Sequence, residues 1–484
     1  MSSRRILGPF NRVEGDLEVQ LELDGDRVAD AWVVSPLYRG YEQILQGKDP
    51  RDALVYVPRI CGICSVSQSV AAAQALADAA QIAPPPNGRL ATNLVLANEN
   101  VADHLTHFYL FFMPDFARQT YATEPWFAHA EARFKAIKGS AAAVAMPARA
   151  EFLNLMGLLA GKWPHSLAIQ PGGTTCAIDA GVQSRIATLL HSFRSFLERE
   201  LFADSLERVV AIDSQEALNS WCDQAPPEQG DLRFFLHLCR ALKLDQLGRG
   251  YDRFMSNGAY GVGEDKLFPA GLWAQGEYRG PQSGAIREDL THAWMNSSHE
   301  PRHPYEGITM PSSGREQGYS WCKAPRLDGE VMEVGALARQ LMAGHPLVQD
   351  LVRCSGGNVQ NRVVARLLEI ARVTLAMQEW VWQIKPREPF CVESALPEEG
   401  QGVGMVEAAR GSLGHWLKIQ RGRLANYQII APTTWNFSPR DAREQPGPLE
   451  LALRGAPLRA GEEDPVAVQH IVRSFDPCMV CTVH

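Results

Sequence analysis

The sequence has no apolar run of the ~18–20 residues that a membrane-spanning helix needs. Its N-terminus, residues 1–10, carries two arginines but lacks the apolar stretch of a secretory signal peptide. It also lacks any block of Lys and Arg, and its formal net charge is −8. These absences argue against a membrane span, a cleaved leader and nucleic acid as a partner. We expect a cytoplasmic protein with reduced thiols, although a folded export partner could carry it across a membrane.

Internal repeats and low-complexity tails are absent as well, which excludes a repeat array. The 484 residues are 45% hydrophobic and could form roughly three average domains or one large one. Alternating apolar patterns predict strands near both ends, and longer periodic patterns predict helices between them. The predicted fold class is a helix-rich α+β body with small sheets near both ends. The expected strands cover residues 17–23, a partner ending near residue 34, and a hairpin over 417–430; the expected helices cover 92–113, 182–197 and 363–375.

Two Cys-x-x-Cys pairs, Cys61 with Cys64 and Cys478 with Cys481, lie near opposite ends of the chain. Thiolates are soft ligands that select zinc, copper(I), nickel or iron, and two such pairs can make a four-sulfur cage. The spacing leaves four interpretations open: a structural zinc site, a dithiol redox pair, a disulfide framework or a catalytic transition-metal centre. The wide separation counts against zinc, and ten cysteines in 484 residues are too few for a disulfide framework. If the pairs meet in space, the two ends of the chain pack together around a metal.

Charged residues flank both pairs. Arg59 lies before the first pair, and Asp476-Pro477 precedes the second. Because proline disfavours a helical conformation in the residue before it, we expect Asp476 to be extended. The last residue, His484, follows Cys481 by three positions and is therefore tethered where it could itself bind a metal.

These flanking residues resemble the two signature motifs of nickel–iron hydrogenase large subunits, and the likeness extends over essentially the whole chain in the same order. It implies that family's fold, with long central helices and small peripheral sheets near both termini. It also implies a single unit over residues 1–484, in which N-terminal strands within 10–45 and the segment 400–484 converge on a metal site. The matching motifs are Asn11-Arg12-Val13-Glu14-Gly15, Tyr38-Arg39-Gly40-Tyr41-Glu42-Gln43-Ile44-Leu45, Arg59-Ile60-Cys61-Gly62-Ile63-Cys64, Gly161-Lys162-Trp163-Pro164-His165 with Pro171-Gly172-Gly173, Ala324-Pro325-Arg326 with Glu333-Val334-Gly335, Glu407-Ala408-Ala409-Arg410-Gly411, Pro432-Thr433-Thr434-Trp435-Asn436 and Asp476-Pro477-Cys478-Met479-Val480-Cys481-Thr482-Val483-His484.

The resemblance implies a Ni-Fe(CN)2(CO) centre. Cys61 and Cys478 would be terminal thiolates on nickel, and Cys64 and Cys481 would bridge nickel and iron. Iron would also carry one carbonyl and two cyanides. Thr433 and the backbone near Pro432 would hydrogen-bond a cyanide, because a buried anionic ligand needs donors.

The implied reaction is the heterolytic cleavage of H2 into a hydride and a proton. The sulfur of Cys478 would be the first base, and Glu14 would accept the proton next. Arg410 would place its guanidinium over the open metal position, with Asp103 and Asp476 orienting it.

A second, hard metal is implied near the C-terminus. Glu42, His484 and the backbone carbonyl of Ile429 match the family's magnesium-type site. Oxygen ligands suit Mg²⁺ or another hard divalent cation.

Four residues beside the implied centre depart from the usual family pattern. Gln68 stands where most catalytic relatives have His, and Ala409 where they have Pro. Ile63 and Phe111 stand where Val and Leu are common, and in a gas channel their larger side chains would hinder O2 more than H2. This set is most similar to the hydrogen-sensing (regulatory) hydrogenases.

The remaining six cysteines show no iron–sulfur spacing, so electrons would need iron–sulfur clusters in a separate small subunit, with which we expect an obligate heterodimer. The sensor interpretation adds a histidine kinase as a partner. The alternative is a respiratory or uptake hydrogenase that feeds a quinone or redox chain. A third hypothesis, a scaffold that has lost its metals, disagrees with the presence of all four ligand cysteines. The six isolated cysteines are Cys176, Cys222, Cys239, Cys322, Cys354 and Cys391.

Overall fold

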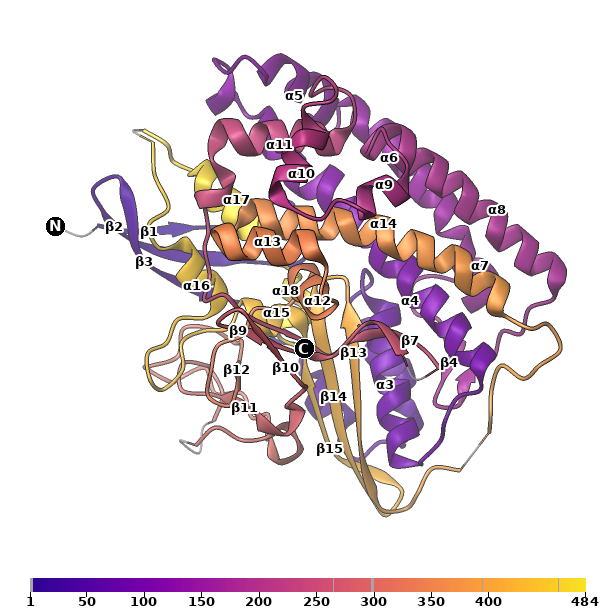
Figure 1. Ribbon diagram of the computed structural model, residues 1–484. Coiled ribbons are helices and arrows are strands. Elements are labelled where there is room, and N and C mark those ends of the chain that lie inside the picture. Colours follow the sequence, from indigo (N-terminus) through magenta and orange to yellow (C-terminus); the bar gives the residue numbers. More distant parts are fainter. Residues whose placement is uncertain (1–2, 264, 297–299, 394, 460) are drawn as a thin grey trace.

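The computed structural model describes residues 3–263, 265–296, 300–393, 395–459 and 461–484. Long helices form the middle and upper part of the molecule, and small antiparallel sheets lie beside and below them (Figure 1). The predicted helix-rich α+β class is therefore confirmed. None of the helices in the described part of the chain has the length and apolar character that a bilayer crossing requires.

The helices range from single turns to the 25 residues of α14. They are α1 (Tyr41–Leu45), α2 (Ala53–Tyr56), α3 (Ser65–Ala79), α4 (Pro86–Thr106), α5 (Phe127–Phe134), α6 (Ser140–Phe152), α7 (Asn154–Ala160), α8 (Ala180–Phe196), α9 (Leu206–Val210), α10 (Gln215–Cys222), α11 (Asp231–Leu242), α12 (Ala336–Met342), α13 (Pro346–Ser355), α14 (Val359–Gln383), α15 (Pro432–Asn436), α16 (Pro448–Leu453), α17 (Val466–Ser474) and α18 (Met479–Thr482).

The strands form two larger antiparallel sheets and several small ones. The sheets are β1 (Ser3–Leu7), β2 (Glu18–Asp24) and β3 (Arg27–Val34); β13 (Gly400–Ala408), β14 (Gly411–Gln420) and β15 (Arg423–Ile430); β6 (Arg253–Ser256), β9 (Gly271–Ala274) and β10 (Glu277–Arg279); and the pairs β4 (Ile169–Gln170) with β5 (Gly173–Thr174), β7 (Ala259–Val262) with β8 (Asp265–Phe268), and β11 (Ile286–Asp289) with β12 (Ala324–Leu327). Both predicted hairpins are present, as β2–β3 and β14–β15. Every second residue of β2 is buried, because strand side chains alternate between its two faces.

Helices α8 and α14 confirm the two predicted amphipathic helices, and the third predicted helix differs at both ends. It begins earlier, at Pro86, because proline is well placed at the first position of a helix, where its missing N–H costs nothing. It is regular to Thr106 and then continues as a π-helix over His107–Phe112. Such wider turns are common at functional sites.

Helix α3 packs directly against strand β13. A Cβ added at Gly402 would lie 2.0 Å from the carbonyl oxygen of Ala75, and one at Gly404 would lie 1.9 Å from that of Ala71. Only glycine permits this approach of two backbones. The close packing places the start of α3, directly after Cys64, beside the sheet that leads to Arg410.

The two ends of the chain lie together. The backbone of Val28 in β3 accepts a hydrogen bond from Gly455 at 2.8 Å and donates one to Ala456 at 3.0 Å. The backbone N–H of Met479 donates to the carbonyl of Glu14 at 2.7 Å. The C-terminus therefore lies in the interior, near α15 and α18 (Figure 1).

Candidate metal centre

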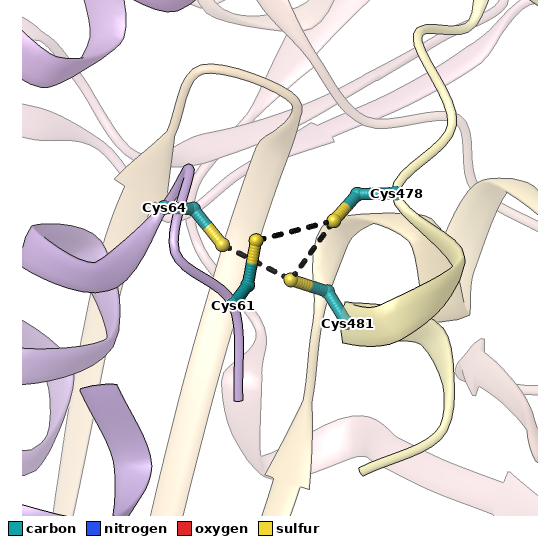
Figure 2. A group of neighbouring side chains, drawn as sticks. All are labelled: Cys61, Cys64, Cys478 and Cys481. Atoms are coloured by element: carbon teal, nitrogen blue, oxygen red, sulfur yellow. Dashed lines mark hydrogen bonds between the residues drawn. The ribbon is translucent and has the colours of Figure 1, made fainter. Parts of the chain in front are cut away.

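Four buried sulfur atoms converge from opposite ends of the chain, and all lie within 4.8 Å of one another (Figure 2). Cys61 and Cys64 belong to the loop before α3, and Cys478 and Cys481 to the first turn of α18. The Sγ–Sγ distances are 3.5 Å between Cys61 and Cys478, 3.0 Å between Cys64 and Cys481, and 3.2 Å between Cys478 and Cys481. The structure thus brings both sequence pairs into one cage.

Arg39 joins the two halves of this cage. Its guanidinium donates to the carbonyl of Ile60, beside the first pair, at 2.6 Å, and to the carbonyl of Val480, inside the second pair. Because one planar side chain satisfies both loops, it fixes their relative position.

A buried carboxylate holds the start of α3, directly after the first cysteine loop. Glu99 on α4 accepts hydrogen bonds from the backbone N–H groups of Val66 and Ser67 at 2.8 and 2.9 Å, at the start of α3. It also accepts from the indole of Trp163 at 3.0 Å. A carboxylate at a helix N-terminus satisfies donors that the helix itself leaves unpaired. Despite these donors, burial raises the pKa of Glu99 to about 7.

The four thiols cannot all ionise without cations. Hydrogen bonds from the neighbouring sulfurs, Cys478 first, hold the pKa of Cys61 well below its usual value. Burial raises the pKa of Cys481, and the surrounding sulfurs, Cys478 first, raise that of Cys64. One thiolate therefore suppresses the others, and bound metal ions would be needed to deprotonate them all.

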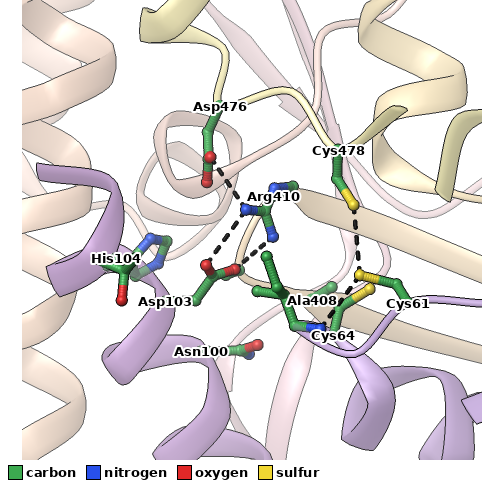
Figure 3. A network of polar contacts seen from close by, with 12 residues as sticks. Cys61, Cys64, Asn100, Asp103, His104, Ala408, Arg410, Asp476 and Cys478 are labelled. Atoms are coloured by element: carbon green, nitrogen blue, oxygen red, sulfur yellow. Dashed lines mark hydrogen bonds and ion pairs between the residues drawn. The ribbon is translucent and has the colours of Figure 1, made fainter. Parts of the chain in front are cut away.

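Arg410 lies between this cage and two carboxylates (Figure 3). Its guanidinium forms a two-pronged ion pair with Asp103 and donates to Asp476 Oδ1 at 3.2 Å. All three side chains are buried, and Arg410 Nε has no hydrogen-bond partner among the described residues. Burial raises the pKa of Asp103 to about 7, whereas at Asp476 the effect of burial is outweighed by Arg410 and His107, which lower the pKa. A fixed, charged donor thus faces the sulfur cage.

The predicted extended conformation of Asp476 is wrong, because its φ is +56°. Asp476 follows the last residues of α17, and its N–H donates to the carbonyl of Arg473 at 3.0 Å. This is the left-handed residue with which many helices end. The helix end therefore outweighs the preference that Pro477 imposes, and it directs the Asp476 carboxylate towards Arg410.

Glu14 lies beside the second cysteine pair. Its backbone forms a β-bridge with Cys478, and its side chain is partly exposed in this chain. Burial raises the pKa of Glu14, and the Cys61 thiolate raises it further.

The residues predicted for the hard metal also meet. His484 Nε2 lies 2.9 Å from the carbonyl oxygen of Ile429 and 3.3 Å from Glu42 Oε1. A cavity of about 10 Å³ borders all three residues, which is room for one water molecule or ion.

An ammonium group that the sequence analysis missed also contacts Glu42. Lys323 Nζ lies 3.0 Å from Glu42 Oε2, 3.5 Å from Glu288 Oε2 and 2.9 Å from Gln428 Oε1. Burial opposes ionisation of Glu42, but Lys323 lowers its pKa to about 2.

The other predicted cofactor-binding residues surround the cage. Thr433 accepts a hydrogen bond from the Cys478 N–H at 3.2 Å, and Pro432 begins α15. The carbonyl of Ala409 accepts from Arg339 at 2.8 Å, while Gln68 lies on α3, one turn after Cys64.

The two gas-channel residues are partly buried. Ile63 packs against the main hydrophobic core, and the carbonyl of Phe111 accepts a hydrogen bond from Arg12 at 3.3 Å. Their effect on gas access stays a prediction.

The fold and cage together define a thiolate-bound metal centre. A family model described as nickel-dependent hydrogenase matches residues 39–138 and 116–484. The periplasmic [NiFeSe] hydrogenase large subunit of Desulfomicrobium baculatum is 28% identical, covering 99% of this chain and 94% of its own length. The Hydrogenase-2 large chain of Escherichia coli K12 is 26% identical, covering 100% and 97%.

Solved structures agree with this match. The [NiFeSe] hydrogenase of Dm. baculatum superimposes with a TM-score of 0.87 at 27% identity, and the Ni-Fe-Se hydrogenase of D. vulgaris Hildenborough with 0.84 at 29%, each covering 100% of both chains. The chain therefore belongs to the nickel-dependent hydrogenases, as a large subunit of an H2 oxidoreductase. Membership in this family implies a Ni–Fe centre, and the residues present fit such a centre. Four buried sulfurs converge, and a buried guanidinium, whose Nε has no partner among the described residues, faces them.

Proposed function

We propose that the chain is the large, catalytic subunit of a regulatory nickel–iron hydrogenase, in which H2 cleavage serves hydrogen sensing. The proposal of H2 cleavage rests on the four-sulfur cage and on Arg410 beside it, which is held by Asp103 and Asp476. When bound there, nickel and iron with their carbonyl and cyanide ligands supply the site at which H2 is cleaved heterolytically.

The proton would leave through residues of this chain. The Cys478 sulfur is the proposed first acceptor, and the Glu14 carboxylate, whose backbone is bridged to Cys478, is the next. A raised pKa brings Glu14 closer to the operating pH, where it can both accept and release a proton.

Arg410 is proposed to act as a fixed charge over the open metal position. Its forked contact with Asp103 and its contact with Asp476 leave little freedom to rotate. Thr433, whose oxygen accepts from Cys478, has no acceptor for its hydroxyl proton among the described residues and could donate it to a cyanide, and the backbone near Pro432 lies beside it.

We propose that Glu42, His484 and the Ile429 carbonyl bind Mg²⁺ or another hard divalent cation. The His484 imidazole already lies within 3.3 Å of both oxygen ligands, and a cavity borders all three residues. Such a cation would hold the C-terminal segment that carries Cys478 and Cys481.

The iron–sulfur small subunit is the proposed partner. Electrons released at a buried centre need further redox groups, and the other cysteines of this chain are separate. Exposed apolar side chains around the first cysteine loop support a docking face: Ile44, Val55 and Leu167 are 41%, 38% and 52% exposed. The hydrogen bond of His165 to the Pro58 carbonyl, at 3.0 Å, brings the Leu167 segment next to that loop.

The sensor subtype is supported by Gln68, Ala409, Ile63 and Phe111 and adds a histidine kinase and a cytoplasmic location to the proposal. The alternative is an uptake or respiratory enzyme. It is favoured by the names of relatives, which include an uptake hydrogenase large subunit of Azotobacter chroococcum and a periplasmic enzyme.

Infrared spectroscopy and metal analysis of the purified heterodimer test the catalytic proposal. We expect carbonyl and cyanide bands together with nickel and iron; zinc without those bands would overturn it. Turnover, cell fractionation and co-purification then separate the two subtypes. Slow H2 oxidation with a bound kinase supports a sensor, and fast oxidation coupled to quinone reduction supports the alternative.

A further inference from the structure

The turn that carries Arg410 is held by a second buried arginine. Arg410 is the last residue of a two-residue turn, because Ala408 pairs with Gly411 across the hairpin of β13 and β14. Arg339 on α12 donates to the backbone carbonyls of Ala408 and Ala409, at 2.8 Å each. Arg339 has no part in the catalytic steps proposed above.

All five N–H groups of the Arg339 guanidinium have an acceptor. Besides the two carbonyls, Glu369 on α14 accepts from Nε and Nη2 at 2.9 Å each, and Glu407 accepts from Nη1 at 2.7 Å. Arg339 and both carboxylates are fully buried. A lysine could not make the same contacts, because its three donors leave one nitrogen atom, whereas these acceptors surround a planar fork.

Glu369 also connects Arg339 to the helix that carries Asp103. Its Oε1 accepts from His104 Nε2 at 3.1 Å, and His104 directly follows Asp103 on α4 (Figure 3). Burial opposes ionisation of Glu369, but Arg339 lowers its pKa to about 2, so this ion pair persists at neutral pH. One guanidinium therefore holds both the turn that presents Arg410 and, through Glu369, the helix that presents its partner Asp103.

Glu407 ties the far side of the turn to the same arginine. Its Oε2 accepts from Arg339, and its Oε1 accepts from the hydroxyl of Ser412 at 2.6 Å, so residues on both sides of the turn share one ion pair. Gly411 has a φ of +132°, and an added Cβ would lie 2.7 Å from the backbone nitrogen of Gly335, the N-cap of α12. The turn therefore packs directly against the start of the helix that carries Arg339.

We infer that Arg339 is a positioning residue for Arg410, because it fixes the backbone that carries the Arg410 guanidinium relative to Asp103 and the sulfur cage. The inference rests on the proposed function, since it concerns the charge that Arg410 holds over the open metal position. A misplacement of about 1 Å at a reacting centre can lower a rate by about 10²-fold, so a small backbone shift at this turn is sufficient to slow H2 oxidation.

The test is a double-mutant cycle in the intact heterodimer. H2 oxidation per bound nickel is the readout, and the carbonyl and cyanide bands report assembly of the centre. Arg339→Lys keeps the charge and loses the fork, so we expect H2 oxidation to fall by about 10-fold. In the Arg410→Lys background the same change should lower it by less than about 2-fold, because the guanidinium to be positioned is already gone. A merely structural role would give equal losses in both backgrounds.

Arg233→Lys is the matched control, because Arg233 is also buried and donates to two backbone carbonyls, those of Phe202 and Gln229, at 3.1 and 3.0 Å. It should leave H2 oxidation unchanged in both backgrounds. Equal losses from Arg339→Lys in the two backgrounds, or no loss in the wild type, would overturn the positioning role. If Arg339→Lys does not assemble, Glu369→Gln, which turns an amide NH2 towards the guanidinium, replaces it and is judged by the same cycle. Absence of carbonyl and cyanide bands from the wild type would instead refute the proposed function.

Discussion

The two candidate metal sites differ in how they balance their own charge. In the sulfur cage four thiols face one another, and the nearby Arg410 is already paired with Asp103 and Asp476. At the C-terminal site a lysine ammonium contacts the Glu42 carboxylate directly. The cage therefore depends on metal ions for its thiolate state, whereas the Glu42 carboxylate of the second site already has a counter-charge from the chain itself. Loss of metal should abolish the thiolate state of the cage, whereas at the second site it should only reduce stability.

The largest effect should come from the cage. Cys478→Ser replaces a soft ligand by a hard one, so nickel should be lost and H2 oxidation should fall by more than about 10³-fold. Nickel content and the infrared bands measure the result. Cys354→Ser, at an exposed cysteine on α13, is the matched control and should keep both. A fully metallated Cys478→Ser protein would contradict the view that the cage needs four thiolates.

Proton transfer should show the next largest effect. Glu14→Gln removes the proposed acceptor, and H/D exchange should fall by about 10²-fold or more. The raised pKa of Glu14 also sets the pH dependence: the carboxylate form grows as pH rises, so wild-type exchange should increase through a midpoint above 4.5. The variant should lose this rise. An unchanged pH profile in Glu14→Gln would remove Glu14 from the path.

Arg410→Lys tests the contacts of Arg410 with Asp103 and Asp476 beside the cage. Lysine keeps the charge but cannot contact Asp103 with a fork, so we expect a decrease of about 10- to 10²-fold in H2 oxidation with normal nickel content. Arg353→Lys, on the surface of α13, should have no effect. Full activity of Arg410→Lys would show that charge alone, without the fork geometry, is sufficient.

The second site offers the sharpest contrast with the cage. Lys323→Met leaves Glu42 and Glu288 buried without their cation, which should cost about 3–5 kcal/mol. Added Mg²⁺ should restore much of this stability, and nickel content should stay normal. Thermal inactivation with and without Mg²⁺ measures it, with Lys385→Met as the exposed control. If Lys323→Met is inactivated at the same temperature with and without Mg²⁺, no cation takes over the role of Lys323.

The sequence predicted the parts of the molecule that carry a local signal. Periodicity predicted α8 and α14, alternation predicted β2–β3 and β14–β15, and paired cysteines with their motifs predicted the cage residues. Glu99, Lys323 and His415, whose ring contacts Gln68, were missed, because Glu99 and His415 are single polar residues inside regular elements and Lys323 lies in a loop just before β12. Their partners lie 32 to 347 residues away along the chain, so no sequence motif indicates these contacts.

The conformation of Asp476 shows a second limit of prediction from local sequence. The local rule for a residue before proline favoured an extended backbone, but the end of α17 imposes φ +56°. One local preference, the helix end, outweighed the other here, and the outcome directs a carboxylate onto Arg410.

The smallest expected effect concerns access of gas to the cage, which the second site does not need. Ile63→Val combined with Phe111→Leu removes side-chain volume at two partly buried positions. If these residues narrow a gas channel, the double variant should be inactivated faster by O2, by a few-fold, because O2 is larger than H2, while H2 oxidation stays nearly constant. Leu375→Val, a partly buried residue of α14, is a control for the loss of one methylene elsewhere. Inactivation by O2 at the wild-type rate would reject the channel, and with it the argument that these two positions mark a sensor.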